Sequence, residues 1–367
     1  MARIGIVTYD FYPLIGGIGR HTFQMFSSLL EADLLFFSPT INSLPRHILI
    51  DFPPIRFLKQ VGVSLWLHFN ASRIIEENHL DKLNIHTGPG GVLCVRSLSV
   101  PVIVTCHHTY RQQLHHIGSQ FWKWIFVPFE KRTYQLATRI VCVSDATKQA
   151  LIDYYDVPEK KIITIYNAVD TNQFHPLGIE KNRNTILYVG RIDKRKGIEF
   201  LITSMPIVVQ KIPDVRLQVG GTGGHLEKMK SLVSRLKLES NVTFLGFVPD
   251  NQLNSLYNQA QCVVVPSIFE GFGITVIEAL AAGTRVVGTD ADGIREILQN
   301  EEYGRLVPYG DCHALSDAIV AELEKPQRAG KLHPKYQADQ FVIRYLNVME
   351  EEATSGGNNS GQGRNPL

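Results

Sequence analysis

The sequence has little cysteine, no long apolar run and almost no net charge, and each of these limits what the protein can be. Its 367 residues include only five cysteines, and none forms a C-x-x-C pair. Neither a disulfide framework nor a standard zinc site is therefore expected. No run approaches the roughly 18 apolar residues of a membrane span. The formal net charge of +2 gives no field that would attract nucleic acid.

No secretory signal is expected from the N-terminal residues. Met1-Ala-Arg is followed at once by the strand-like run Ile4–Thr8, which is too short for the apolar region of a signal peptide. Together with unpaired thiols, this predicts a cytoplasmic protein. Residues 353–367 have no large apolar side chain before Leu367, and we expect them to be disordered.

The chain does contain a repeated alternation of short apolar runs with helical patterns. Continuous apolar strands separated by helices predict parallel sheets covered on both faces, a doubly wound α/β arrangement. The length and the 44% hydrophobic content allow two domains, each with its own core. The runs are Ile4–Thr8, Leu34–Phe37, Val102–Thr105, Ile140–Val143 and Ile162–Ile165 in the first half, and Thr185–Val189, Arg216–Val219, Val242–Leu245, Cys262–Val265 and Arg285–Gly288 in the second.

The boundary between the two series is predicted near the polar stretch Gly178–Asn184. Residues 1–175 then form an N-terminal domain and residues 176–335 a C-terminal domain. A last amphipathic helix at about 336–352 follows a bridge rich in Pro, Gly and Lys. We expect this helix to pack back on the N-terminal domain.

The most informative segment is Pro266–Arg285, which follows an apolar strand. It contains Glu270 and Glu278, separated by seven residues, and the sequence Gly271-Phe272-Gly273 that leads into Ile274 and Thr275. The glycines allow backbone to approach a ligand, and a helix N-terminus at the carboxyl end of a strand suits a phosphate. Two carboxylates two helical turns apart can contact the two ends of one extended ligand. Glu270 would reach a sugar and Glu278 a ribose.

This segment resembles the signature of glycosyltransferase family 4, and the similarity runs in register from Ile4 to about Leu323. The resemblance implies the GT-B fold, in which two Rossmann-like domains face a cleft. It also implies transfer of a hexose-type sugar from a UDP- or GDP-sugar with retention of anomeric configuration. No cofactor and no metal ion would be needed, and the C-terminal domain would bind most of the donor.

A second segment, Ile186–Leu201, has a strand that delivers Arg191 and a helix that starts beside Lys196. A guanidinium and an ammonium on one loop can neutralise a pyrophosphate. Cations at a helix N-terminus oppose its dipole, so an anionic ligand gives them a reason to be there. The resemblance assigns Arg191 and Lys196 to the donor phosphates and to the departing charge. The alternative is a solvated basic turn that includes Lys194 and Arg195.

Three further segments receive roles from the resemblance. Gly16 and Gly17, before an amphipathic helix, would lie against the donor phosphate. His107 would face the donor sugar, although its neighbour His108 leaves that assignment open. Phe247 and Val248 would lie near the base. For each, the alternative is an ordinary loop or core residue.

Two other activities fit the same fold: a nucleotide-sugar 2-epimerase, and a catalytically silent subunit that binds sugar nucleotide. The acceptor, whether a glycan, a lipid-linked molecule or a small molecule, is not encoded in any motif. Residues 120–133 interleave Trp and Phe with Lys123, Lys131 and Arg132. This pattern fits peripheral contact with the inner face of a membrane, and it fits slightly better a helix packed through Trp122 and Phe126.

Overall fold

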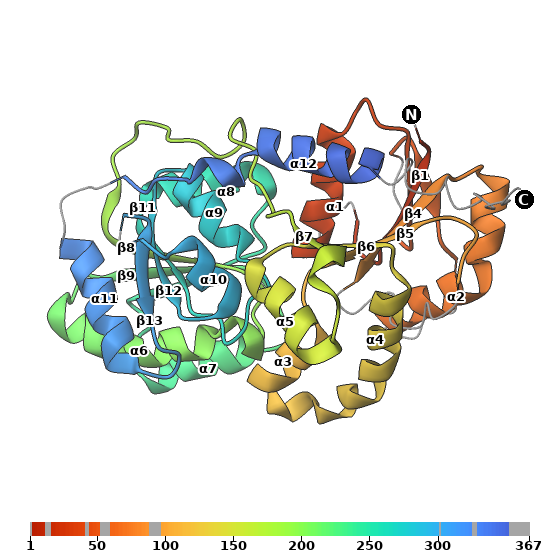
Figure 1. The fold of residues 1–367 in the computed structure, drawn as a ribbon. Helices are drawn as coiled ribbons and strands as arrows, with labels where there is room; N and C mark the ends of the chain where they lie inside the picture. The colour runs from red at the N-terminus through yellow and green to blue at the C-terminus, as the bar shows by residue number, and fades with distance from the viewer. Residues whose placement is uncertain are drawn as a thin grey trace, which may run out of the picture.

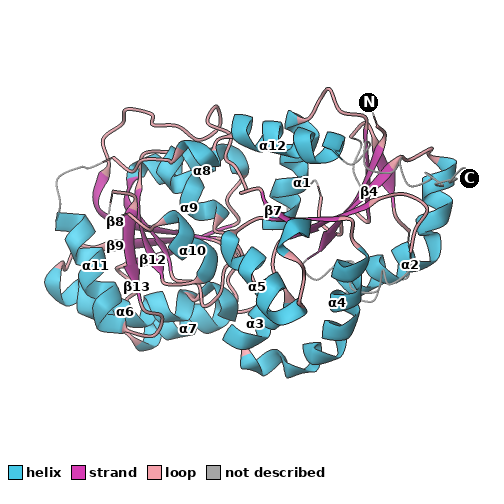
Figure 2. Cartoon of the chain, viewed as in Figure 1, coloured by secondary structure: helices cyan, strands magenta, loops and turns pink. Residues whose placement is uncertain are grey.

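The computed structural model describes residues 2–11, 16–40, 44–51, 59–87, 97–300, 302–324 and 329–351. Within them the chain forms two parallel sheets, each lying between helices (Figure 2). The predicted doubly wound arrangement, occurring twice, is confirmed. The tail at 353–367 lies outside the described residues.

The first sheet has the strand order β3-β2-β1-β4-β5-β6-β7, and all of its neighbours are parallel. Its strands are β1 (Ile4–Val7), β2 (Leu34–Ser38), β3 (His47–Leu49), β4 (Lys82–Thr87), β5 (Val102–Cys106), β6 (Arg139–Cys142) and β7 (Ile162–Thr164). Its helices are α1 (Gly17–Ser28), α2 (Lys59–Glu77), α3 (Tyr110–His116), η1 (Gly118–Phe126), α4 (Val127–Leu136), α5 (Asp145–Tyr155) and η2 (Glu159–Lys161).

The second sheet has the order β10-β9-β8-β11-β12-β13 and is likewise parallel. Its strands are β8 (Asn182–Val189), β9 (Arg216–Gly220), β10 (Val242–Gly246), β11 (Ala260–Val265), β12 (Arg285–Thr289) and β13 (Gly304–Val307). The helices are η3 (Lys194–Lys196), α6 (Ile198–Lys211), α7 (Leu226–Arg235), α8 (Asp250–Gln259), α9 (Ile274–Ala281), α10 (Asp292–Ile297), α11 (Cys312–Glu324), η4 (Pro334–Tyr336) and α12 (Ala338–Glu351).

The strand orders explain where a ligand can bind. The order reverses beside β1 and β4 in the first sheet and beside β8 and β11 in the second. In an open parallel sheet, ligands bind outside the carboxyl ends of the strands at such a reversal. The loops that leave β1, β8 and β11 carry the glycine-rich, basic and glutamate-rich segments singled out in the sequence.

The last helix, α12, lies beside α1 on the first half of the molecule (Figure 1). Its Phe341 and Tyr345 are buried in the same apolar cluster as Ile4 and Phe11. The chain that leads into it pairs with the interdomain segment through a bridge between Val169 and Gln337. The two connections between the halves therefore run side by side.

No helix within the described ranges is both long enough and apolar enough to cross a membrane. The four cysteines described, Cys106, Cys142, Cys262 and Cys312, form no disulfide with one another. Burial raises the pKa of the Cys262 thiol to about 12, so this group stays protonated and inert. Cys94 lies outside the described residues.

Candidate functional site

A half-buried charge cluster forms where the loop after β8 meets the loop after β11. The Lys196 ammonium donates to Glu270 Oε2 at 2.6 Å, and the Arg195 guanidinium lies 3.5 Å from the same oxygen. Ser267 Oγ donates to that oxygen at 3.2 Å. Burial alone would raise the pKa of Glu270, but the two cations outweigh it and the pKa is about 2. Glu270 is therefore a carboxylate at any working pH.

Arg195 was not predicted as a site residue. Its guanidinium also donates to the carbonyl of Phe269 at 2.9 Å, so it ties the basic loop to the glutamate loop. The predicted Arg191 instead has a side chain that is 56% exposed and lies 3.4 Å from Asp193. The structure thus brings Lys196 and Glu270 together and leaves Arg191 at the rim. Arg195 is one of three consecutive basic residues, and nothing in the sequence marks which of them turns inward.

Glu278 contacts the other half of the molecule. Its Oε1 accepts from Arg20 of α1 at 3.0 Å, and its Oε2 accepts from the Tyr257 hydroxyl at 2.8 Å. Arg20 also donates to Asp250 at 2.6 Å. Burial raises the pKa of Glu278, and the Arg20 charge opposes that rise. Arg20, Tyr257 and Asp250 were not predicted: the contacts of Arg20 depend on how the halves dock, and Tyr257 and Asp250 reach the site from α8, which carries no motif.

Two of the predicted glycines, Gly17 and Gly271, lie at close approaches between the two halves. A Cβ at Gly17 would lie 3.4 Å from Ile274 Cδ1, and one at Gly271 would lie 2.4 Å from the His107 carbonyl oxygen. Gly16 precedes the first residue of α1, and Gly273, at φ +114°, precedes the first residue of α9. The loops after β1, β5 and β11 thus meet, and the glycines let their backbones approach one another closely.

The other predicted site residues differ in their surroundings. Phe272 is buried and packs on Tyr336, so only its backbone is free to meet a ligand. Phe247 is 73% exposed beyond the end of β10, and Val248 packs near Gly220. Thr275 is half-buried in the first turn of α9.

The two neighbouring histidines differ in their contacts. His107 is buried against the rings of His21 and His86. His108 packs on Phe269 of the second half. Burial and the nearby Arg195 charge lower the pKa of His108 to about 3, so it is neutral.

An Asp-x-Asp sequence, Asp290-Ala291-Asp292, is a further feature that the sequence reasoning overlooked. Such a pair can supply carboxylate ligands to a divalent cation. In the structure Asp290 pairs with Arg295, and Asp292 lies 3.6 Å from His116. Both carboxylates thus already have a partner within the protein.

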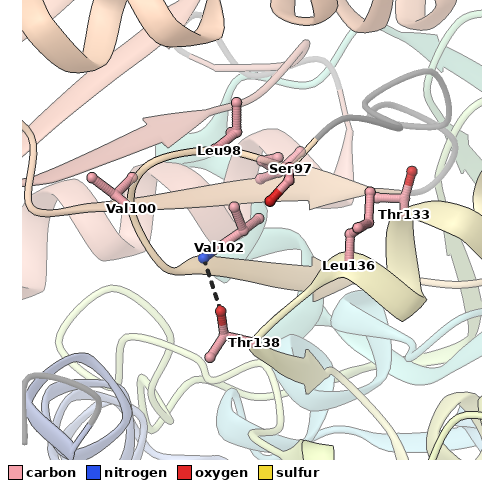
Figure 3. A pocket seen from close by; sticks show the side chains of 8 residues that line it. Ser97, Leu98, Val100, Val102, Thr133, Leu136 and Thr138 are labelled. Carbon is pink, nitrogen blue, oxygen red and sulfur yellow. Dashed lines mark hydrogen bonds between the residues drawn. The ribbon is translucent and has the colours of Figure 1, made fainter. Parts of the chain in front are cut away.

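One cavity lies apart from these residues, within the first half (Figure 3). Its volume is about 140 Å³, and its lining includes Leu98, Val102, Leu136 and Thr138. Val102 begins β5 whereas His107 follows the end of that strand. The cavity is therefore at the opposite end of the sheet from the candidate site, it has no charged lining residue, and we assign it no role.

Gly197 fixes the position of Lys196, which leads to a stability prediction. Gly197 has φ +69°, and a Cβ there would lie 1.7 Å from the Pro266 carbonyl oxygen. We expect Gly197→Ala to lower the free energy of unfolding by several kcal/mol, since it adds a backbone clash to the left-handed cost. Urea unfolding measures this. Gly178→Ala is the matched control, because Gly178 has φ +67° with nothing within 4 Å and should lose only about 1–2 kcal/mol. Equal losses in the two variants would contradict the clash.

Comparison with known proteins covers both halves. Residues 15–173 match the family model described as Glycosyltransferase Family 4, and residues 169–338 match the model of Glycosyl transferases group 1. The phosphatidyl-myo-inositol mannosyltransferase of Mycolicibacterium smegmatis is 28% identical over 363 residues, which cover 94% of this chain and 90% of that protein.

Two solved structures share the fold. Sucrose-phosphate synthase from Thermosynechococcus elongatus superimposes with a TM-score of 0.84 at 20% identity, covering 97% of this chain and 100% of that one. HepE of Anabaena, in complex with UDP and glucose, gives a TM-score of 0.75 at 20% identity, with 96% and 100% coverage. The predicted pair of Rossmann-like sheets is thus confirmed as the GT-B fold, and the chain belongs to family 4 of the glycosyltransferases.

Proposed function

We propose that this glycosyltransferase moves a hexose from a UDP- or GDP-sugar to an acceptor with retention of configuration and without a metal ion. The observation that carries the proposal is the Arg195–Lys196–Glu270 cluster beside the first turn of α9. Two cations and a helix N-terminus at the carboxyl ends of β8 and β11 suit a pyrophosphate. HepE of Anabaena, which binds UDP and glucose, supports the choice of donor class.

The reaction requires a fixed positive environment for the leaving nucleoside diphosphate. Lys196, Arg195 and the backbone N–H groups around Gly273 supply this positive environment. Arg191, whose side chain is exposed, would contact the phosphates from the edge of the site. Fixed donors of this kind contribute about 10²–10³ in rate each. Glu270 keeps the Lys196 ammonium directed into the site, and a sugar hydroxyl can donate to the carboxylate. The departing phosphate takes the acceptor's proton on the same face of the sugar, which gives retention.

The nucleoside is proposed to bind between Glu278 and the loop after β10. The ribose hydroxyls would replace the Arg20 contact on Glu278 Oε1, since Arg20 retains Asp250 as its second partner. Tyr257 stays on Oε2 and fixes the carboxylate. Phe247 and Val248 would flank the base.

A donor panel tests the proposal and separates it from its alternatives. The purified protein is incubated with UDP- and GDP-hexoses and a set of acceptors, and released nucleoside diphosphate and the product anomer are measured. A retained anomer formed in the presence of a chelator supports the proposal. Conversion of the donor to its 2-epimer would instead show an epimerase, and binding without turnover a silent subunit.

The acceptor is proposed to be lipid-linked, because an apolar surface lies on the first half. Five large side chains along η1 and α4 are exposed, whereas Phe126 is buried against Tyr110. The interpretation of Trp122 as a core residue is therefore wrong, since it is 42% exposed. We define the aromatic surface as Phe121, Trp122, Trp124, Ile125 and Phe129.

Charge points to an anionic bilayer as the occupant of the aromatic surface. Lys123 lies over the Trp122 ring at 5.7 Å, and Arg132 follows in α4 beside Lys131, whose ammonium pairs with Asp156. Aromatic rings favour the bilayer interface, and each nearby cation adds about 1 kcal/mol on anionic lipid. The similarity to a phosphatidyl-myo-inositol mannosyltransferase is consistent with a lipid acceptor.

Vesicle flotation measures this contact. We expect co-flotation with phosphatidylglycerol vesicles at low salt, and a loss of at least tenfold in the bound fraction for Trp124→Ser/Ile125→Ser. The control is Phe69→Ser on α2, an aromatic that lies outside the aromatic surface and is more exposed than Trp124 or Ile125. No flotation of the unaltered protein at low salt would contradict lipid contact and favour a soluble or polysaccharide acceptor.

A further inference from the structure

Three buried histidines meet beneath the candidate site, and the reaction proposed above gives no role to any of them. His21 lies in α1, His86 near the end of β4 and His107 directly after β5. The His21 and His107 rings meet edge to face with centroids 4.9 Å apart. His86 Nδ1 lies 3.1 Å from His107 Nε2. The three residues come from separate elements, so the fold itself assembles them.

All three imidazoles are neutral under working conditions. Burial lowers the pKa of His21 to about 4, although its hydrogen bond with Asn167 opposes the change. Burial and the proximity of the other rings hold the pKa of both His86 and His107 well below the usual range. A neutral imidazole has one N–H donor and one acceptor nitrogen, so each hydrogen bond in the group constrains the tautomer of its neighbours.

The His21 tautomer follows from its two partners. Nδ1 lies 2.5 Å from Asn167 Oδ1, which can only accept, so Nδ1 carries the proton. Nε2 then accepts from the Tyr345 hydroxyl at 2.9 Å. Asn167 follows β7 near the connection between the halves, and Tyr345 belongs to α12. His21 is thus fixed by both segments that cross between the domains.

The His86 tautomer follows from the cost of burial. His86 Nε2 is buried and has no hydrogen-bond partner among the residues that the structure describes. An orphaned buried N–H is rarer and more costly than an under-satisfied acceptor. The proton therefore belongs on Nδ1, which donates to His107 Nε2. His107 must then carry its own proton on Nδ1.

We propose that His86 and His21 are positioning residues that hold His107 in its neutral, Nδ1-protonated form, so that His107 serves sugar transfer as a hydrogen-bond donor and not as an acid or base. The role of His107 in sugar transfer rests on the proposed function, whereas the tautomer assignment does not. The His107 carbonyl contacts the Gly271 position of the glutamate loop, so the ring is fixed at the point where the two halves meet.

A transition-metal ion is the competing occupant, since one nitrogen from each ring lies within 4.8 Å of the others. Within the described part of the chain no carboxylate or thiolate joins this group. A divalent charge would therefore be buried without an anion, at a large desolvation cost. It would also replace one hydrogen bond of His21, since both ring nitrogens of His21 already have partners, Asn167 and Tyr345. The hydrogen-bonded network is favoured on both counts.

Nitrogen-15 NMR of histidine-labelled protein tests the tautomers directly, with His107 assigned by the signals lost in His107→Gln. We expect His107 to be protonated at Nδ1 and to remain neutral throughout the pH range in which exposed histidines titrate, because burial holds its pKa well below the usual value. An Nε2-protonated His107, an imidazolium at pH 7, or stoichiometric Zn²⁺ binding that shifts all three rings would overturn the proposal. This readout stands even if the protein transfers no sugar, so it separates failure of the network from failure of the proposed function.

Kinetics test the catalytic consequence. His86→Leu removes the N–H group that donates to His107. We expect kcat to fall about tenfold, which corresponds to the upper end of the free energy of one neutral hydrogen bond. The KM for the sugar nucleotide and the Kd of nucleoside diphosphate should change less than twofold. His86→Asn places an amide N–H near the Nδ1 position and should recover most of the lost rate. His47→Leu, which loses an imidazole bonded to Ser38 on the sheet edge, controls for stability. Equal kcat in the Leu and Asn variants would contradict the positioning role.

Discussion

Replacing Lys196 with alanine is expected to lower the rate of sugar transfer at least tenfold while the protein stays folded. The ammonium is half-buried and bonded to Glu270 at 2.6 Å, so its loss leaves both Glu270 and the donor phosphate short of one cation. A hydrogen bond to a charged group contributes about 1.5–3 kcal/mol, which corresponds to roughly one to two orders of magnitude in rate. Steady-state release of nucleoside diphosphate measures the loss.

Lys194→Ala is the matched control for Lys196→Ala. Both residues belong to η3 and carry the same charge, but Lys194 is exposed. The control should retain nearly full activity, since an exposed charge at this distance is screened. Similar rates in the two variants would show that general basicity, and not a placed ammonium, supports the reaction.

Replacing Glu270 with glutamine is expected to lower the rate of transfer about 10²-fold, which is more than the Lys196 substitution does. Nucleotide binding, in contrast, should not be weakened. The change removes the anion that Lys196 and Arg195 share. Both cations then become free for the phosphates, so calorimetry should give an equal or lower Kd for nucleoside diphosphate. Transfer falls because the sugar loses its acceptor and the ammonium loses its orientation.

Two comparisons make the Glu270 result specific. Glu199→Gln, which alters an exposed carboxylate paired with Lys228, should change neither quantity. Glu278→Gln should weaken the binding of nucleoside diphosphate, since Glu278 is proposed to contact the ribose and that contact does not require the transferred hexose. Because the Glu270 pKa is about 2, its charge stabilises the fold above the unfolded-state value near 4.5 and is lost only as pH falls toward 2. Between pH 5 and 8 the activity profile should therefore show no step from this group.

The periodicity of apolar runs was sufficient to predict the two parallel sheets, but not every strand. Strand β4, Lys82–Thr87, was missed because it carries Lys82, Asn84 and His86. These polar residues are buried and have specific partners: Lys82 donates to the Met349 carbonyl, and Asn84 accepts from Thr105. A strand that satisfies polar groups through tertiary contacts has no apolar signature.

The candidate site was predictable only where a motif carries it. Glu270 and Lys196 stand in motifs whose spacing indicates a ligand, and they meet in the structure. Arg20 and Arg195 became visible only in three dimensions, because Arg20 bonds Glu278 from 258 positions away along the chain. His21 and His86 were missed for the same reason, since a lone histidine in a helix or strand has no pattern of its own.

The most direct test of the account is the release of nucleoside diphosphate from UDP- and GDP-hexoses by the purified protein in the presence of a chelator and phosphatidylglycerol vesicles that contain candidate lipid acceptors. We expect turnover with at least one donor, a product that keeps the donor's anomeric configuration, and a rate that falls at least tenfold in Lys196→Ala. Turnover that needs a divalent cation, an inverted product, or equal rates with and without the Lys196 ammonium would contradict it.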